Sequence, residues 1–213
     1  MTTRREILLR EGMRLFGEQG YAATSIAQIE EAAGLSPGSG SFYKHFASKQ
    51  QMLEAGLDKL LSSTVVPPPA SEVADRPRDV LELAAKGGFA RMEEDRDLSR
   101  VVFRGLQAFP ELLKRFGNEE IARRHAEITR LLADLSGDAS ADWEAIAVVL
   151  QGATAHYWLL ADVFGEHPTG VSQERVVRAL ADLATLAVGM GPHPGGEGDG
   201  RAAAESSGAS RAG

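Results

Sequence analysis

Residues 36–49 gather side chains that donate hydrogen bonds, and their types suit the binding of an anionic partner. Hydroxyl, ammonium and imidazole groups are carried here by Ser36, Ser39, Ser41, Tyr43, Lys44, His45 and Lys49. Groups of these kinds contact phosphate oxygens and, inside a groove, the edges of bases. The sequence carries no Ser or Cys nucleophile motif, no Gly-rich phosphate loop and no His-Glu zinc pattern. We therefore predict a binding protein that is not an enzyme and uses no cofactor or metal.

The first element that must position this segment is a short helix over residues 24–33. Thr24 is expected to be its N-cap, because a hydroxyl can accept a free backbone N–H of the first turn. One apolar face is predicted at helical spacing by Ile26, Ile29, Ala32 and Ala33. Glu30 and Glu31 are expected on the opposite, polar side, and Gly34 is expected to end the helix in the left-handed conformation.

A second helix is predicted to begin at Ser36-Pro37, since Ser is a good N-cap and Pro fits the first helical position. Phe42 and Phe46 are four residues apart and are expected to insert one face of this helix into the core. Ser48 then caps a longer helix. Two short helices joined by a tight Gly turn make a helix-turn-helix, whose second helix enters the major groove of DNA.

This segment resembles the N-terminal DNA-binding domain of the TetR family of bacterial regulators, over about residues 4–53. The matching positions, in order, are Phe16, Gly20-Tyr21, Thr24-Ser25-Ile26, Ala33-Gly34-Leu35-Ser36, Phe42-Tyr43-Lys44-His45-Phe46 and Ser48-Lys49. Several spaced motifs agree in order and separation, so the resemblance is specific. One departure is that Ser39-Gly40-Ser41 separates Gly38 from the aromatic pair, a longer and more Gly-rich spacing than is usual in the family.

The resemblance and the side-chain chemistry together imply a set of DNA contacts. Ser39, Gly40 and Ser41 are expected at the start of the recognition helix, whose N-terminal residues face base edges. Further contacts are expected from Thr24, Ser25, Ser36, Tyr43, Lys44, His45 and Lys49. Arg4 and Arg5 are expected to form a mobile arm that enters the minor groove or follows the backbone. The alternative for these cations and rings is an ordinary solvated side chain or, for His45, a structural role.

Composition is that of a globular protein whose two ends differ in charge. The 213 residues are 43% hydrophobic and 25% charged, which suits a packed core. There is no run of about eighteen apolar residues, no apolar stretch of the signal-peptide kind at the N-terminus and no cysteine, so a cytoplasmic protein is expected. Residues 1–50 carry six Lys or Arg and five Asp or Glu, a net charge of +1, and the remainder carries −8. This asymmetry favours DNA as the partner of the N-terminal part.

An all-α fold is predicted, because no segment alternates for long enough to be a strand. Beyond the helix that Ser48 begins, helices are predicted near 77–94, 97–107, 110–117, 119–136, 141–165 and 172–190. Pro67-Pro68-Pro69 is expected to stop the helix that precedes it. The predicted organisation is a three-helix helix-turn-helix domain over 1–50, a helical effector-binding and dimerisation domain over 51–190, and a disordered tail over 191–213, which is rich in Gly, Ala and Ser.

Dimerisation is expected because one copy offers few base-reading groups, and two copies on a near-palindromic operator double them. The last two helices are predicted to form the interface, as in the resembled family. The candidates are Ala153, Tyr157, Leu160, Val176, Leu180, Leu183, Ala184 and Ala187. The alternative is that these apolar stripes face the core of a single protomer.

The resembled family binds a small effector in its C-terminal domain, and such a pocket needs an apolar lining with a few polar anchors. The candidates are Phe89, Met92, Phe103, Gln107, Trp143, His156 and Trp158. The alternative for each aromatic residue is an ordinary place in the core. The acidic run at residues 93–97 is expected to be a solvated face, because its spacing matches no metal loop.

Together these features predict a homodimeric, sequence-specific transcription regulator, most simply a repressor that a small molecule of unknown identity releases from its operator. One alternative is a helical ligand- or partner-binding module without specific DNA recognition. Binding that shows no sequence preference and disappears at moderate salt would favour that alternative. A second alternative is a small-molecule enzyme in the C-terminal part, which turnover of a bound ligand would reveal.

Overall fold

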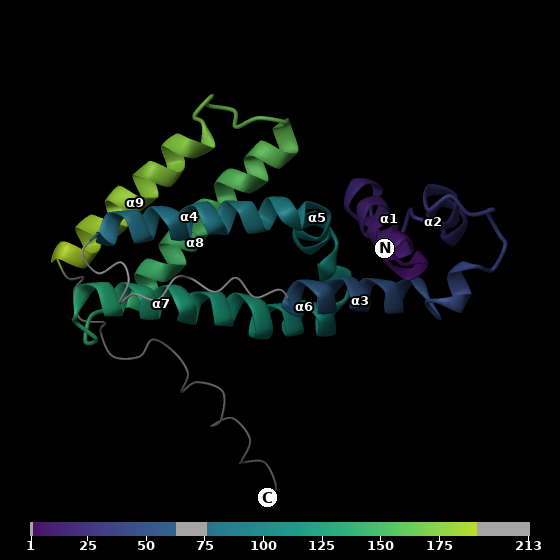
Figure 1. Cartoon of the computed structure of the whole chain (residues 1–213), viewed down its shortest axis with the longest axis horizontal. Helices are drawn as coiled ribbons and strands as arrows, with labels where there is room; N and C mark the ends of the chain where they lie inside the picture. Colours follow the sequence, from purple (N-terminus) through teal and green to yellow (C-terminus); the bar gives the residue numbers. More distant parts are fainter. Residues whose placement is uncertain (1, 63–75, 191–213) are drawn as a thin grey trace, which may run out of the picture.

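The computed structural model describes residues 2–62 and 76–190, and every element of regular structure in these ranges is a helix (Figure 1). The predicted all-α fold is confirmed. The N-terminal part contains α1 (Arg4–Gln19), α2 (Ile26–Ala32), the 3-10 turn η1 (Phe42–Lys44) and α3 (Lys49–Ser62). The C-terminal part contains α4 (Pro77–Glu94), α5 (Arg96–Arg104), η3 (Leu106–Ala108), α6 (Pro110–Phe116), η4 (Gly117–Ile121), α7 (Ala122–Ser136), α8 (Trp143–Phe164) and α9 (Gln173–Met190).

Helices α1 and α3 begin where the sequence supplies caps. The Thr3 hydroxyl accepts the Glu6 N–H at 3.2 Å, and the Glu6 carboxylate accepts the Thr3 N–H at 2.7 Å, which completes a capping box. At the start of α3, the Ser48 hydroxyl accepts the Gln51 N–H at 3.1 Å. These bonds satisfy N–H groups that a helix start leaves unpaired, and they confirm the predicted start of α3.

The core of the N-terminal part is built by α1, α2, η1 and α3, and it continues into α5 and η3. Phe42 and Phe46 are buried in this core, as predicted. Helix α1 lies against α5 so closely that a Cβ on Gly17 would stand 2.8 Å from the Asp97 carbonyl oxygen. A side chain at position 17 would therefore push the two helices apart. The N-terminal part is thus packed directly onto the C-terminal part of the chain.

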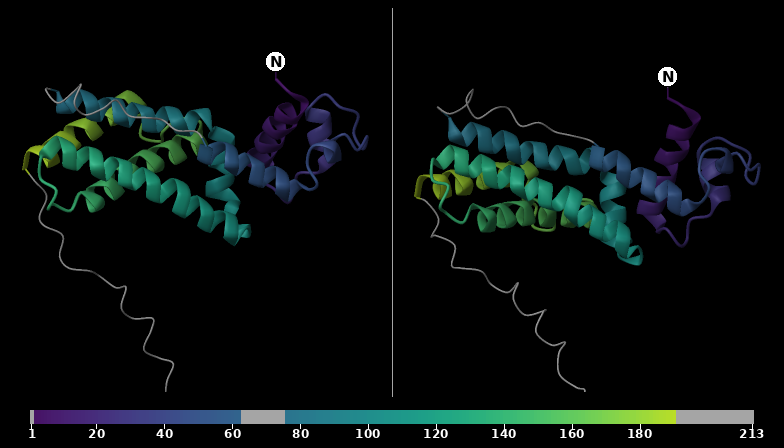
Figure 2. Two further views of the ribbon diagram at one scale, coloured as in Figure 1. Left: turned by 60° about the horizontal axis from the view of Figure 1, so that its bottom comes forward. Right: turned by 90° about the horizontal axis from the view of Figure 1, so that it is seen from below.

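The C-terminal part is a bundle in which α4 packs along α9 and α7 packs along α8 (Figure 2). Its interior has two groups of buried side chains. One surrounds Leu132 and Trp143, and the other contains Phe89, Trp158 and Val177. Helix α3 extends from the N-terminal part toward this bundle (Figure 1).

The predicted helices of the C-terminal part agree closely with the structure except at two places. Helix α5 ends at Arg104, and the short turn η3 replaces the end of the helix predicted over 97–107. Gly117 does not break the chain's helical path, because its φ of −57° and ψ of −46° are helical, and the π-helical turn η4 joins α6 to α7. The predicted stop at Pro67-Pro68-Pro69 and the predicted tail over 191–213 lie outside the described residues.

Helix α8 is long and apolar enough to cross a membrane by length and composition, and it is the one such helix among the described residues. Its mean hydropathy over the relevant window is 1.2. Within the bundle, however, Trp143, Ala147 and Trp158 of this helix are buried against other helices of the same chain. Its apolar character therefore serves packing inside the fold on at least one face.

Candidate DNA-binding surface and its link to the C-terminal helices

Helix α2 begins one residue later than predicted, which moves Thr24 into the core. Ser25 is the N-cap, since its hydroxyl accepts the Gln28 N–H at 3.2 Å and the Gln28 side chain accepts the Ser25 N–H at 2.8 Å. Thr24 is 1% exposed, and its hydroxyl donates to the Gly20 carbonyl at 2.8 Å. The prediction that Thr24 caps α2 and offers its hydroxyl to DNA is therefore wrong. Ser25 is exposed at the start of α2 and stays a candidate contact.

The turn after α2 has the predicted left-handed glycine. Gly34 has a φ of +71°, a conformation that L side chains rarely adopt. The Leu35 N–H donates to the Glu30 carbonyl at 2.8 Å and the Gly34 N–H donates to the Glu31 carbonyl at 2.9 Å. This pair of bonds is the Schellman motif, which ends a helix sharply and satisfies its last carbonyls.

The next segment is a loop and not the helix that Ser36-Pro37 predicts. Gly38 and Gly40 have φ values of +74° and +71°, which a right-handed helix excludes. The Ser39 N–H donates to the Ser36 carbonyl at 3.1 Å, which closes a turn with Pro37 and Gly38 at its centre. Pro followed by a glycine of positive φ is typical of a type II turn. The helical part of the recognition segment is therefore reduced to η1.

The candidate contacts around this loop differ in accessibility. Buried Phe42 and Phe46 anchor the segment, and Tyr43 between them is 60% exposed with its ring edge-on to Phe42 at 5.5 Å between centroids. Ser36, Ser39 and Lys44 are exposed, and Gly40, Ser41 and His45 are half-buried. The accessible surface therefore offers hydroxyls, one phenol and one long cation, which are groups that contact phosphates and base edges.

Glu30, which the sequence analysis assigns to the polar side of α2, is 1% exposed and organises the loop. Its carboxylate accepts the Gly38 N–H at 2.7 Å and the Phe42 N–H at 2.9 Å. The hydrogen bond from Phe42, with help from Gly38, holds the pKa of Glu30 below its ordinary value although burial opposes this. The signal for this role was present in the sequence, because position 30 follows Ile26 by four residues and so shares its apolar face.

Three predicted phosphate contacts have other surroundings. The Lys49 ammonium donates to the carbonyls of Tyr21 and Thr24 at 2.8 and 2.6 Å and lies 4.4 Å from the centre of the Tyr21 ring. It thus closes the turn between α1 and α2, which leaves little of it for a phosphate. Arg4 and Arg5 are not a mobile arm, because both belong to the first turn of α1. The Arg5 guanidinium lies over the Phe46 ring at 4.7 Å.

Comparison with known proteins points to this same segment. Residues 8–55 match the family model described as bacterial regulatory proteins, tetR family. The chain carries a DNA-binding domain of the TetR family in these residues. Its N-terminal part is accordingly a TetR-type helix-turn-helix domain, in which the loop of residues 36–41 and the turn η1 occupy the place of the recognition helix.

Similar proteins of this family include two curated relatives and a solved structure. The HTH-type transcriptional regulator BetI of Rhizobium meliloti (strain 1021) is 33% identical over 132 residues, which are 61% of this chain and 57% of BetI. The HTH-type transcriptional repressor KstR2 of Mycolicibacterium smegmatis is 41% identical over 59 residues, which are 28% of each protein. The chain thus spans less than two thirds of the length of either relative. A TetR-like transcriptional regulator from Rhodococcus sp. RHA1 shares the fold with a TM-score of 0.63 and 18% identity, over 87% of this chain and 95% of that one.

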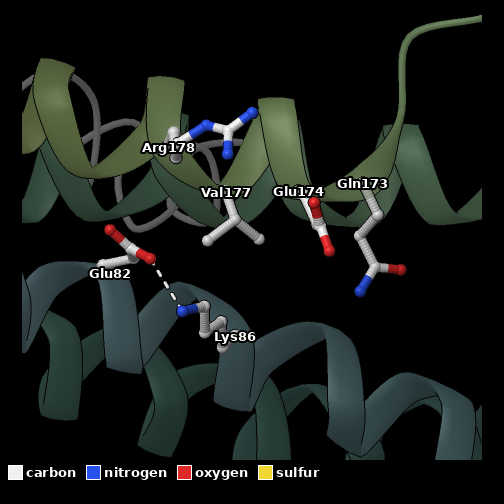
Figure 3. Close-up of a pocket in the computed structure, with 6 residues that line it drawn as sticks. All are labelled: Glu82, Lys86, Gln173, Glu174, Val177 and Arg178. Atoms are coloured by element: carbon white, nitrogen blue, oxygen red, sulfur yellow. Dashed lines mark ion pairs between the residues drawn. The ribbon is translucent and has the colours of Figure 1, made fainter.

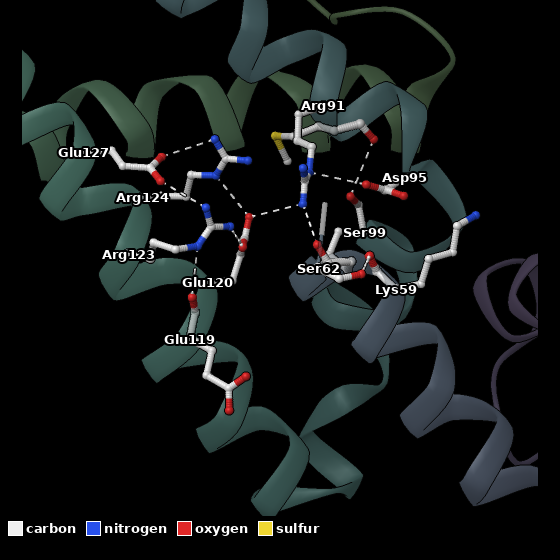
Figure 4. A network of polar contacts seen from close by, with 12 residues as sticks. Lys59, Ser62, Arg91, Asp95, Ser99, Glu119, Glu120, Arg123, Arg124 and Glu127 are labelled. Carbon is white, nitrogen blue, oxygen red and sulfur yellow. Dashed lines mark hydrogen bonds and ion pairs between the residues drawn. The ribbon is translucent and has the colours of Figure 1, made fainter. Parts of the chain in front are cut away.

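A buried polar network joins the TetR-type domain to the C-terminal helices (Figure 4). Arg91 of α4 is 7% exposed and donates to the Leu60 carbonyl of α3 at 2.7 Å. The same guanidinium lies 3.3 Å from Asp95 and 3.6 Å from Glu120, and Glu120 also accepts from Arg124 at 3.1 Å. Burial, the largest effect, raises the pKa of Asp95 although Arg91 opposes the change. The acidic run at 93–97 is therefore only in part the solvated face that was predicted.

A second link runs from α1 through α5 to α8. Helix α1 meets α5 at Gly17, as described above, and Arg100 of α5 forms a buried ion pair with Asp162 of α8. The Asp162 side chain is 1% exposed, and Arg100 approaches it at 2.8 Å from Nη2 and at 3.0 Å from Nε. A displacement of α8 therefore has a direct route to the DNA-binding domain.

The predicted effector-pocket residues do not gather around one cavity. Phe89, Met92 and Trp158 belong to one group of packed side chains, and Trp143 belongs to the other. Phe103 is 39% exposed with its ring 6.0 Å from that of Trp158. Gln107 and His156 are exposed. The prediction that these residues line one pocket is wrong for Trp143 in particular. Its ring is buried in the group around Leu132, and its indole N–H donates to the Asp138 carbonyl at 2.6 Å.

A small depression between α4 and α9 lacks the size and the apolar lining expected of the predicted effector pocket (Figure 3). Its volume is about 150 Å³, whereas pockets for drug-sized ligands occupy about 300–1,000 Å³. Its lining is largely charged or polar and consists of Glu82, Lys86, Gln173, Glu174, Val177 and Arg178. None of the predicted pocket residues is among them. This depression does not suit an apolar effector.

The predicted dimer-interface residues divide into two sets. Tyr157, Leu180 and Ala184 are buried inside the protomer, so their assignment to an interface is wrong. Leu160, Val176 and Ala187 are half-buried, and Ala153 is exposed. Leu183 is 61% exposed, and other exposed apolar residues accompany it on α8 and α9, namely Val148, Val149, Leu186 and Met190.

Proposed function

We propose that this protein is a sequence-specific, DNA-binding transcription regulator of the cytoplasm, which acts as a homodimeric repressor and leaves its operator when a small molecule binds. The observation that carries this proposal is the surface formed by Ser36, Ser39, Tyr43 and Lys44. Buried Phe42 and Phe46 lie on either side of Tyr43 and Lys44 and anchor this surface within a TetR-type helix-turn-helix domain. Its groups are those that contact phosphates and bases, and one relative over 59 residues, KstR2, is named a repressor.

Dimerisation through α8 and α9 supplies the second half of the reading surface. Val149 is followed at helical spacing by Gly152 and Ala153, and Leu183 by Leu186 and Met190. Leu183 and Met190 are 61% and 82% exposed in the single chain. An apolar face of this kind on a monomer favours association, and a two-fold dimer suits a near-palindromic operator.

Regulation by an effector is supported by two features of the bundle. Thr129 Oγ1 of α7 and Gln151 Oε1 of α8 are buried and have no hydrogen-bond partner within the described residues. Such atoms are costly unless another group satisfies them, so a ligand that enters between these neighbouring helices gains polar anchors there. Movement of α8 would then reach the DNA-binding domain through Asp162 and Arg100.

The proposal is tested by fluorescence anisotropy with the DNA that flanks the protein's own gene, beside a scrambled duplex, across a salt series. A preference of about a thousandfold at physiological salt is expected of a specific regulator. If the flanking DNA gives no preference, selection from a random DNA pool decides the matter. Failure to enrich any sequence there would refute the proposal and leave the alternative of a ligand- or partner-binding module.

Lys44 provides the matched test of the surface itself. Lys44→Met removes the exposed cation of η1 and is expected to weaken binding to all sequences and to lower the salt slope by about one unit. Lys86→Met removes the same charge from α4, in the C-terminal bundle, and serves as the control. Equal effects of the two substitutions would show that net charge, and not this surface, governs binding.

A further inference from the structure

The loop between α2 and η1 takes the place of most of a recognition helix, and its conformation depends on one buried carboxylate. Both carboxylate oxygens of Glu30 are engaged. Oε2 accepts the Gly38 N–H at 2.7 Å, and Oε1 accepts the Phe42 N–H at 2.9 Å and faces the Ser39 hydroxyl at 3.5 Å. A single side chain thus spans the whole loop from its first turn to the start of η1.

The backbone carbonyl of Glu30 also contributes to the start of this loop. Its carbonyl accepts the Leu35 N–H at 2.8 Å in the Schellman motif that ends α2. The residue therefore fixes where the loop leaves α2 and where it rejoins the core at Phe42. Gly38 and Gly40 give the intervening chain its left-handed positions but supply no side chain to hold it.

A buried carboxylate close to a DNA-binding surface needs a compensating advantage, because phosphate repels it and burial disfavours its charge. The N–H donors of the loop provide that compensation locally, since hydrogen bonds to an ionised acceptor are stronger than neutral ones. The advantage is that these hydrogen bonds order the loop in the free protein. A Gly-rich loop that is already ordered loses less conformational freedom when it meets DNA.

We propose that Glu30 is a positioning residue for DNA recognition, whose carboxylate holds the loop of residues 38–42 in the shape that reads the operator. This inference rests on the proposed function, because it explains how that function is achieved without a recognition helix. The loop presents Ser39, Gly40 and Ser41 to the bases, and Glu30 itself does not touch DNA because it is 1% exposed.

The test compares Glu30→Gln with Glu31→Gln. The two substitutions remove the same charge from adjacent positions of α2, but Glu31 is exposed and its side chain makes no hydrogen bond to the loop among the described contacts. Glu30→Gln keeps the size of the side chain and replaces one acceptor oxygen by an NH₂ group, which cannot accept the N–H that it faces. Affinity for the selected operator and for a scrambled duplex is measured for both proteins.

Glu30→Gln is expected to lower operator affinity by about tenfold to a hundredfold relative to Glu31→Gln, the loss that follows from one or two charged hydrogen bonds. Affinity for scrambled DNA should change equally in the two variants. Amide hydrogen exchange in the free protein should show faster exchange at Gly38 and Phe42 in Glu30→Gln alone, with α1 and α3 still protected. A role confined to stability would leave the ratio of operator to scrambled affinity unchanged.

The outcomes separate this inference from the proposed function. If the wild-type protein prefers its operator but the affinity ratio of Glu30→Gln equals that of Glu31→Gln, the positioning role is refuted while the function stands. If the wild-type protein prefers no DNA sequence, both fail. Should Glu30→Gln not fold, Gly38→Ala perturbs the same loop, because its φ of +74° strains an alanine although no atom crowds the added Cβ. An unchanged ratio in that variant also refutes the role.

Discussion

Lys49 is a cation whose main task in this structure is to hold a turn. Its half-buried ammonium donates to two backbone carbonyls at 2.8 and 2.6 Å. Lys49→Met keeps the apolar stem but removes both bonds. We expect the free energy of unfolding to fall by about 1–3 kcal/mol, since hydrogen bonds to charged groups contribute about 1.5–3 kcal/mol and partial exposure weakens them. Urea denaturation measures the loss, and a salt series of DNA binding should keep the wild-type slope.

Lys44→Met is the complementary control for that substitution. Its exposed side chain has no such carbonyl partners among the described contacts, so stability should stay within about 0.5 kcal/mol of wild type while the salt slope falls. The opposite pattern, in which Lys49→Met lowers the slope by about one unit and leaves stability intact, would return Lys49 to the phosphate contacts that the sequence predicts.

For single residues, the sequence predicted the burial of apolar side chains better than it predicted which groups the polar side chains contact. The core positions of Phe42 and Phe46 followed from their spacing, since two apolar residues four apart share one face of a helical turn and can be buried together. Which of Thr24 and Ser25 is the N-cap of α2 depends on which of the two adjacent hydroxyls is buried, and the local sequence pattern does not decide that. The role of Glu30 could not be predicted without its tertiary contact with the loop, although the sequence does place it on the apolar face of α2.

Among the elements, the contact between α3 and α4 gives the sharpest expectation. Arg91→Met removes the guanidinium that bonds the Leu60 carbonyl at 2.7 Å and lies between Asp95 and Glu120. Loss of one partner from a buried ionic network typically costs about 3–5 kcal/mol, and the low end is expected because Glu120 keeps Arg124. Urea denaturation at neutral pH measures this change.

Arg76→Met is the control for the substitution at Arg91. Arg76 directly precedes α4, its side chain is 79% exposed, and it lies 3.8 Å from Asp79, which is 59% exposed, so its loss should cost about 0–1 kcal/mol. Equal stabilities of the two variants would show that the Arg91 network adds nothing beyond a surface ion pair. The helix α3 would then be attached to α4 by apolar packing alone.

Helix boundaries in the C-terminal part were predictable because caps and glycines mark them locally, as Gly137 does at the end of α7 with its φ of +71°. The recognition segment was not predictable by the same rules. Ser36-Pro37 carries a valid helix-start signal, but Gly38 and Gly40 adopt positive φ, and Glu30 accepts the Phe42 N–H that such a helix would direct to the Gly38 carbonyl. Gly117 shows the reverse case, since this glycine is helical where the local pattern favours a break.

For the whole molecule, the two links described above make the DNA-binding domain sensitive to the bundle. One passes from α8 through Asp162 and Arg100 to α5 and then to α1. The other passes from α4 through Arg91 to the Leu60 carbonyl of α3. Because α1 and α3 are held by different helices of the bundle, a shift of α8 relative to α4 would rotate the reading surface. In a dimer such a rotation changes the separation of the two reading surfaces, which is a difference between states that an effector can exploit.

That mechanism depends on a dimer through α8 and α9, and Leu183 is the residue at which to test it. Leu183→Glu places a charge on an apolar face where Leu183 is 61% exposed in the single chain, so the protomer should still fold while association becomes unfavourable. Sedimentation should show monomers, and operator affinity should fall by about a hundredfold or more, since the second half-site no longer contributes an effectively intramolecular contact. Leu83→Glu changes a 53%-exposed leucine of α4 in the same way and should remain dimeric with full affinity. A Leu183→Glu protein that stays dimeric would move the interface to another face, and one that is monomeric yet binds as tightly as wild type would show that a single reading surface suffices.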